Sequence, residues 1–176
     1  ETEGELKRAR ENLHYRATHD SLTGLLNREA ILDMLDREFA RSERERTPIA
    51  VLLADLDHYQ DVNDRFGHPV GDDVLREIAG RFVRAVRGYD LVGRYGGEEF
   101  LLILGGCSAT EAMARAEQLR LAIEFGLVFS RRSTASTWPR TRSMASASKR
   151  GLVKARPNRS KASSRCSLRV RSVPWK

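Results

Sequence analysis

The chain has 176 residues, 40% of them hydrophobic and 31% charged, and its formal net charge is +7. This length fits one compact domain with short appendages and excludes a large multidomain enzyme. The two cysteines have no Cys or His neighbours at ligand spacing, which excludes a disulfide framework or a zinc site and favours a reducing, cytoplasmic setting. No apolar run approaches the roughly 20 residues that cross a bilayer. Because the chain lacks an initial Met, we expect it to be a piece of a longer protein.

Leu6 and Leu13 stand seven residues apart among charged residues and predict a linker helix over residues 1–19. Turn and N-cap residues over 20–28 precede a predicted amphipathic helix over 29–41. The apolar run 49–54 predicts a strand that is buried on both faces.

Residues 71–88 carry apolar side chains at helical spacing, and residues 109–124 do so again. Between these predicted helices, the apolar runs 91–95 and 100–104 flank a glycine turn and predict a hairpin. Helices and strands therefore interleave over 20–126, which predicts an α/β or α+β sandwich with helices against a sheet.

The charge changes sign at about residue 126. Residues 1–126 hold all 24 acidic residues with 17 Lys and Arg, whereas residues 127–176 hold 14 Lys and Arg and no acid. The second segment also has only 8 Leu, Ile, Val or Phe among its 50 residues, too little apolar surface to offset the entropy of ordering. We expect residues 127–176 to be a disordered basic tail.

Three acidic residues lie at predicted strand ends. Asp55 ends the buried strand, and Glu98 and Glu99 lie at the tip of the hairpin. If the strands are neighbours, these carboxylates converge, and Mg²⁺ usually takes one or two carboxylates together with waters and substrate phosphates. Gly96 and Gly97 permit positive φ and a close approach of backbone to a ligand. Each feature alone is typical of an ordinary turn, but their combination favours a phosphoryl-transfer site.

The segment Gly96-Gly97-Glu98-Glu99-Phe100 resembles the signature of GGDEF domains, the bacterial diguanylate cyclases. Further blocks agree with it in the right order. Residues 20–28 match the family's DxLTGLxNR, residues 54–68 match ADxDxFKxxNDxxGH, and Gly71-Asp72 matches its GD. The resemblance covers residues 20 to about 125.

The resemblance implies an α+β, palm-like (ferredoxin-like) sandwich whose mainly antiparallel sheet is flanked by helices. Such domains condense two GTP into cyclic di-GMP and two pyrophosphates with Mg²⁺ or Mn²⁺. Two copies meet as a homodimer, so that each presents one GTP to the other. We therefore expect residues 1–19 to be a signalling helix after an upstream sensory domain, and residues 20–126 to be the GGDEF domain. Whether the parent protein is anchored in a membrane stays open.

The resemblance also implies roles for individual residues. Asp55, the Leu56 carbonyl and Glu98 would hold metal, with Glu99 as a further ligand or acid, and Asn63 and Asp72 would read guanine. Gly96 and Gly97 would lie against the phosphates. Arg87 and Asp90 form an RxxD at the place of the family's inhibitory product site, where the alternative is a helix-end Arg followed by a turn acid. His19 and His68 are expected to be structural.

The match fails toward the C-terminus. Family members continue with a VTVSxG-like strand and a helix bearing an AKxxGRN-like block, and neither is present, so we expect the domain to be C-terminally incomplete. Gln60 stands where the family usually has a lysine. Each lost cationic phosphate contact is worth roughly 1.5–3 kcal/mol, which weakens the expectation of activity for this chain. A frameshift near codon 126 is our hypothesis for the origin of the tail.

Two alternatives remain open at this stage. A catalytically inactive domain would keep Arg87 and Asp90 and bind cyclic di-GMP, or bind GTP, without turnover. A nucleic-acid module would use the basic tail, but only Trp138 and Trp175 are available there for stacking and no RNP or helix-turn-helix pattern is present, so no specific nucleic-acid partner is predicted.

Overall fold

The computed structural model describes residues 2–130 and 167–173, which contain five helices and four strands. They are α1 (Thr2–Thr18), α2 (Arg28–Glu45), β1 (Ile49–Asp57), α3 (Tyr59–Phe66), α4 (His68–Ala85), β2 (Leu91–Arg94), β3 (Glu99–Gly105), α5 (Ala109–Ser130) and β4 (Ser167–Val173).

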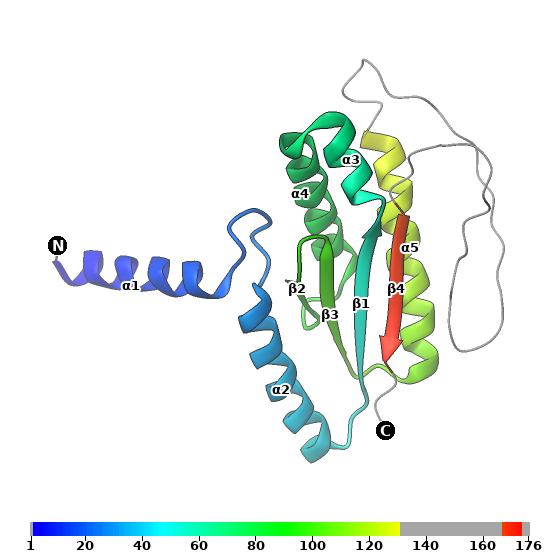
Figure 1. Ribbon diagram of the computed structural model, residues 1–176. Helices are drawn as coiled ribbons and strands as arrows, with labels where there is room; N and C mark the ends of the chain where they lie inside the picture. Colours follow the sequence, from blue (N-terminus) through cyan, green and yellow to red (C-terminus); the bar gives the residue numbers. More distant parts are fainter. Residues whose placement is uncertain (1, 131–166, 174–176) are drawn as a thin grey trace.

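The strands form one sheet in the order β2-β3-β1-β4, and every neighbouring pair is antiparallel (Figure 1). Helix α2 packs on one face of the sheet, and α4 and α5 pack on the other. The predicted α+β sandwich with an antiparallel sheet is therefore confirmed.

Alternation along β1 decides which side chains reach each face of the sheet. One row enters the larger core with α4 and α5, and it consists of Ala50, Leu52, Ala54 and Leu56. The residues between them face the side of α2, and Asp55 continues this second row beyond Leu53. Asp55 thus belongs to the rigid central strand and not to a loop.

Helix α2 lies very close to the sheet. Ile31 is fully buried, and a Cβ on Gly93 of β2 would stand 2.6 Å from the Cβ of Ile31. Only glycine fits at position 93 without displacing the helix. Asn27 caps this helix, because its side chain accepts a hydrogen bond from the Ala30 N–H at 2.9 Å.

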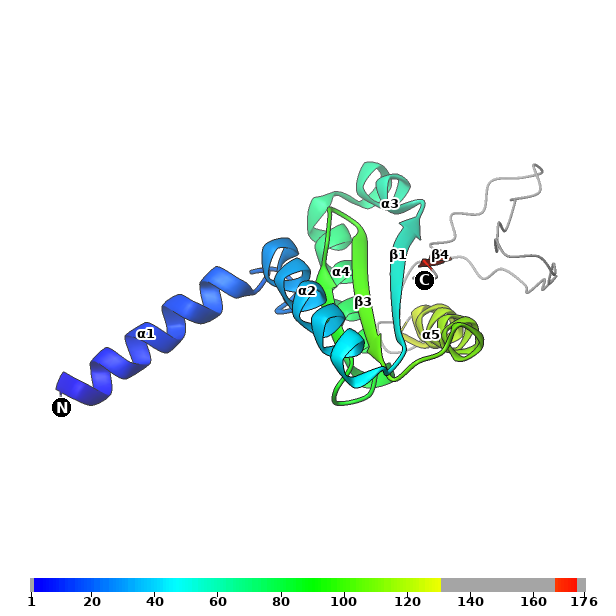
Figure 2. The same ribbon diagram turned by 90° about the horizontal axis from the view of Figure 1, so that it is seen from below.

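Helix α1 projects away from the sandwich, and none of its residues is buried (Figures 1 and 2). Leu6 and Leu13 remain 72% and 68% exposed, so no contact with the described residues buries these two leucines. Among the helices in the described part of the chain, none is both long enough and apolar enough to span a membrane.

Several elements differ from the expectations. The short helix α3 was not predicted, and α5 continues to Ser130, past the expected boundary at residue 126. The expectation of a disordered tail is wrong for Ser167–Val173, because this segment is β4 and pairs with β1 from Val51↔Val173 to Asp57↔Ser167. Backbone pairing with β1 forms this strand, although the side-chain composition of the segment did not indicate one. The rest of the tail lies outside the described residues.

The packing of α2 generates a stability prediction. Ile31→Ala should lower the free energy of unfolding by about 2–4 kcal/mol, because the side chain leaves a cavity over β2. Leu32→Ala is the matched control, since the neighbouring side chain is 36% exposed and should cost less than about 1 kcal/mol. Urea denaturation measures both values, and equal losses would contradict the packing described here.

Candidate functional site

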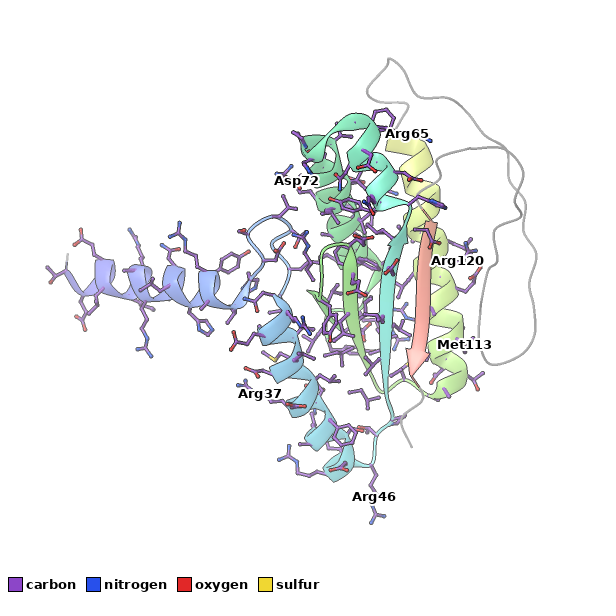
Figure 3. All side chains as sticks on the ribbon, in the orientation of Figure 1. Arg37, Arg46, Arg65, Asp72, Met113 and Arg120 are labelled. Atoms are coloured by element: carbon purple, nitrogen blue, oxygen red, sulfur yellow. The ribbon has the colours of Figure 1, made fainter. Side chains whose placement is uncertain are left out.

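The register between β1 and β3 brings the three predicted acids to one end of the sheet. Asp55 lies opposite Glu99, and the Leu56 N–H donates to the Glu98 carbonyl at 3.3 Å. Asp72 lies at the same end of the molecule, where β1 ends and α4 begins (Figure 3). The convergence predicted from the strand ends is therefore present.

The turn from residue 95 to 98 is tied back onto the start of β3. The N–H groups of Tyr95 and Gly96 both donate to the Glu99 carbonyl, at 2.8 and 3.2 Å. A Cβ on Gly96 would lie 2.5 Å from Glu99 Oε2, so this glycine makes room for the carboxylate. A Cβ on Gly97 would meet nothing within 4 Å. Neither glycine has a positive φ, so the left-handed conformation that glycine permits is not used at either position.

The acids repel one another. Burial raises the pKa of Glu98 above its ordinary value, and the nearby charges of Asp55 and Glu99 raise it further. Mutual repulsion of this kind is relieved when a divalent cation or a proton enters the site.

The donor set fits a cation that is completed by its substrate. Among residues 2–130 and 167–173, no three His, Cys, Asp or Glu side chains form a ready-made metal cage. The Leu56 side chain is a hydrocarbon without a donor atom, so only its backbone carbonyl could serve as a ligand. Two carboxylates with a carbonyl leave open positions, which suits Mg²⁺ or Mn²⁺ held partly by waters and phosphates.

The predicted guanine readers come from two consecutive helices. Asn63 lies on α3 and Asp72 on α4, and the Asn63 Oδ1 occupies the space where a Cβ on Gly71 would be. This packing places the amide against the residue that precedes Asp72. The left-handed Gly67, at φ +82°, allows the sharp turn between the two helices.

Tyr59 is a residue of this site that sequence reasoning missed. Burial raises the pKa of its phenol, the side-chain hydrogen bond from Asn63 lowers it, and the charges of Asp72 and Glu98 raise it. The hydroxyl is therefore within electrostatic reach of both the predicted base readers and the acidic turn. The sequence did contain a signal for this residue. The family block ADxDxFKxxND has phenylalanine at this position, so the tyrosine adds a hydroxyl group to the family pattern.

Arg94 is a second residue missed from the sequence, and it fastens the turn to the start of the domain. Its guanidinium donates to the Gly97 carbonyl at 2.7 Å and to both Asp20 carboxylate oxygens at 3.1 and 3.2 Å. Asp20 also accepts from the N–H and hydroxyl of Thr23, at 2.9 and 2.6 Å. The block at 20–28 thus holds the signature turn through one arginine.

Arg87 and Asp90 lie before β2, at the opposite end of that strand from the signature turn. Arg87 is exposed and donates to the Tyr89 hydroxyl at 2.7 Å. The Asp90 side chain is 2% exposed, accepts from the Arg87 N–H at 2.9 Å and pairs with Arg115 at 3.3 Å. The arginine is available to an anionic ligand, whereas the aspartate is occupied in closing the turn. Arg115 had no signal in the sequence pattern.

The Asp20–Arg94 pair generates a prediction with a defined pH dependence. Although burial raises the pKa of Asp20, its hydrogen bonds with Thr23 and Arg94 bring the pKa below the ordinary value. A lowered pKa means that this stabilisation is complete above the ordinary Asp value of about 3.9 and is lost as pH falls through the folded value. Asp20→Asn should therefore cost about 1.5–3 kcal/mol near pH 7 and less in acid.

Urea denaturation between pH 3 and 7 measures this loss, with Asp36→Asn at an exposed position of α2 as the control. A cost that stays constant over this range would contradict the charge-assisted role of Asp20.

Glu98 generates a prediction of the opposite sign. Because its pKa is raised in the fold, the folded state binds the proton more tightly, and wild-type stability falls as pH rises through that pKa. Glu98→Gln removes this loss and should stabilise the cation-free protein at pH 7 by roughly 0.5 kcal/mol. Denaturation in EDTA at pH 4 and pH 7 checks it, and a destabilised variant at pH 7 would contradict the repulsion.

Comparison with known proteins identifies the family of the chain. Residues 17–135 match the family described as "Diguanylate cyclase, GGDEF domain". Diguanylate cyclase DosC of Escherichia coli K12 is 41% identical over 105 residues, which are 60% of this chain and 23% of DosC. The chain thus spans about a quarter of the length of this curated relative.

Two solved structures from Caulobacter crescentus share the fold. The GGDEF domain of DgcB in complex with c-di-GMP has a TM-score of 0.60 at 38% identity, covering 62% of this chain and 64% of that one. The coiled coil and GGDEF domain of DgcB, also with c-di-GMP, has a TM-score of 0.68 at 27% identity, covering 97% and 78%. With the acidic turn, its register and the family match in agreement, the chain belongs to the GGDEF domain family of diguanylate cyclases.

Proposed function

We propose that this chain is a diguanylate cyclase domain that condenses two GTP into cyclic di-GMP and two pyrophosphates. The observation that carries the proposal is the pairing of Asp55 with Glu99, with the Leu56 N–H on the Glu98 carbonyl. This pairing concentrates negative charge that would repel a triphosphate unless a cation were bound. The related DosC is named a diguanylate cyclase, and the related DgcB was solved with c-di-GMP.

The residues take the following parts in this proposal. Asp55, the Leu56 carbonyl and Glu98 hold Mg²⁺ or Mn²⁺, and Glu99 is a further ligand or an acid beside it. The cation supplies charge screening for the phosphates. Gly97 leaves open space at the turn, so that a phosphate can approach the backbone between Gly96 and Glu98. Asn63 and Asp72 offer an amide and a carboxylate to the guanine edge.

The reaction needs two copies of the domain, because each GTP must be attacked by the other. Helix α1 supports such a homodimer, since Leu6 and Leu13 lie exposed on a helix that projects from the sandwich. A second α1 from a partner chain could cover both leucines. An upstream sensory domain in the parent protein would act through this helix.

A binding domain without turnover is the second candidate, and one observation favours it. Gln60 is exposed on α3, where the family block has a lysine, so one cation for the phosphates is missing. Such a domain would bind GTP at the acidic turn, or bind cyclic di-GMP through the exposed Arg87.

One assay separates the candidates. Purified chain is incubated with GTP and Mg²⁺, and cyclic di-GMP is measured by mass spectrometry. The wild type should form product, and Glu98→Gln should lower the rate about 100-fold. The control Asp33→Asn changes an exposed acid on α2 and should leave the rate unchanged. Binding of GTP or cyclic di-GMP, measured by calorimetry, without product formation in the wild type would support the second candidate. Absence of product and of binding to either nucleotide would overturn both.

A further inference from the structure

The Tyr59 phenol lies where Asn63 and Gly71 meet. The tyrosine is 8% exposed, and its hydroxyl would stand 3.0 Å from a Cβ on Gly71, the same Cβ that the Asn63 Oδ1 would overlap. The absent side chain of Gly71 therefore makes one small space that holds both polar groups. A phenylalanine at position 59 would fill the same volume without the hydroxyl.

The amide of Asn63 is only half satisfied in this arrangement. Its side chain donates a hydrogen bond to the Tyr59 oxygen, and only Nδ2 can be that donor. Its Oδ1 is the one buried side-chain oxygen or nitrogen of the described residues that has no hydrogen-bond partner. A buried acceptor without a donor is costly, which favours a ligand that brings an N–H to this oxygen.

Guanine carries the donors that this oxygen lacks. The carboxylate of Asp72 can only accept hydrogen bonds, so it matches the N1–H and one N–H of the 2-amino group. The 2-amino group has a second N–H, which the Asn63 Oδ1 can accept while Nδ2 stays on the phenol oxygen. Both ends of the amide are then paired.

We propose that Tyr59 is a positioning residue whose hydroxyl holds the Asn63 amide in the orientation that reads guanine. This inference rests on the proposed function, because it assumes that the nucleotide bound beside Asp72 is a guanine nucleotide. The hydroxyl acts only through Asn63, and no bond to the substrate is assigned to it.

The test compares affinities for GTP and ATP, measured by calorimetry with Mg²⁺ on the full chain. Tyr59→Phe should weaken GTP binding by about three- to tenfold, the value of one hydrogen bond, and leave ATP binding unchanged. Tyr15→Phe is the matched control, because it removes a phenol on α1 that donates to the Gly24 carbonyl, and it should change neither affinity.

A double-mutant cycle distinguishes positioning from a general loss of packing. In the Asn63→Ala background, Tyr59→Phe should have no further effect on GTP affinity. An additive loss, or an equal loss for GTP and ATP, would overturn the inference and leave the proposed function intact. Absence of GTP binding by the wild type would overturn both.

A measurement on the unsubstituted chain keeps the inference testable if Tyr59→Phe does not fold. The side-chain amide NMR signals of Asn63 should shift on addition of GTP and stay in place on addition of ATP. Signals that are unmoved by saturating GTP would show that the amide does not contact the base, and the inference would be wrong.

Discussion

The antiparallel register of β1 and β3 is the constraint on which the site depends. It places Asp55 opposite Glu99, because the five consecutive pairs from Val51↔Ile103 to Asp55↔Glu99 share one register and fix each other's alignment. A slip of one residue would turn every side chain of one strand to the other face, taking Leu52 out of the core and Asp55 into it. The hydrophobic effect therefore fixes the position of the acids, although they contribute none of the apolar contacts.

The polar groups at this same end of the sheet lower the stability of the fold. The charge repulsion that raises the pKa of Glu98 is unfavourable until a cation is bound, and the Asn63 oxygen lacks a donor. Arg94 opposes this by linking Asp20 with the Gly97 carbonyl, so the turn remains in place while its acids repel one another. Unfavourable local electrostatics inside a well-fixed frame are typical of sites prepared for a ligand.

Sequence patterns predicted the parts of the fold that follow from local apolar periodicity. The run 49–54 and the hairpin around Gly96 were predicted because buried strands and glycine turns have strong local signals. Helix α3 was missed because its eight residues bury only Tyr59 and Val62. Strand β4 was missed because a strand that pairs at the edge of β1 needs backbone groups more than apolar side chains.

In the site, the family motif predicted the acids, but it did not predict the contacts between distant residues. Asp20 and Arg94 are 74 residues apart in sequence, and Asp90 and Arg115 are 25 apart. Nothing in the local pattern of either partner indicates the other, because such pairs depend on how the strands and helices are placed in space.

Gly97 shows that a residue of the Gly96–Phe100 signature can be required for a reason other than folding. Any residue can adopt its backbone conformation, and a Cβ there would meet no atom of the described residues within 4 Å. Folding alone therefore leaves this position unconstrained, in contrast to Gly93 beneath α2. If a larger side chain at position 97 abolishes function, it does so by blocking the ligand that binds at the turn. One of the two signature glycines is then required by ligand binding and not by folding.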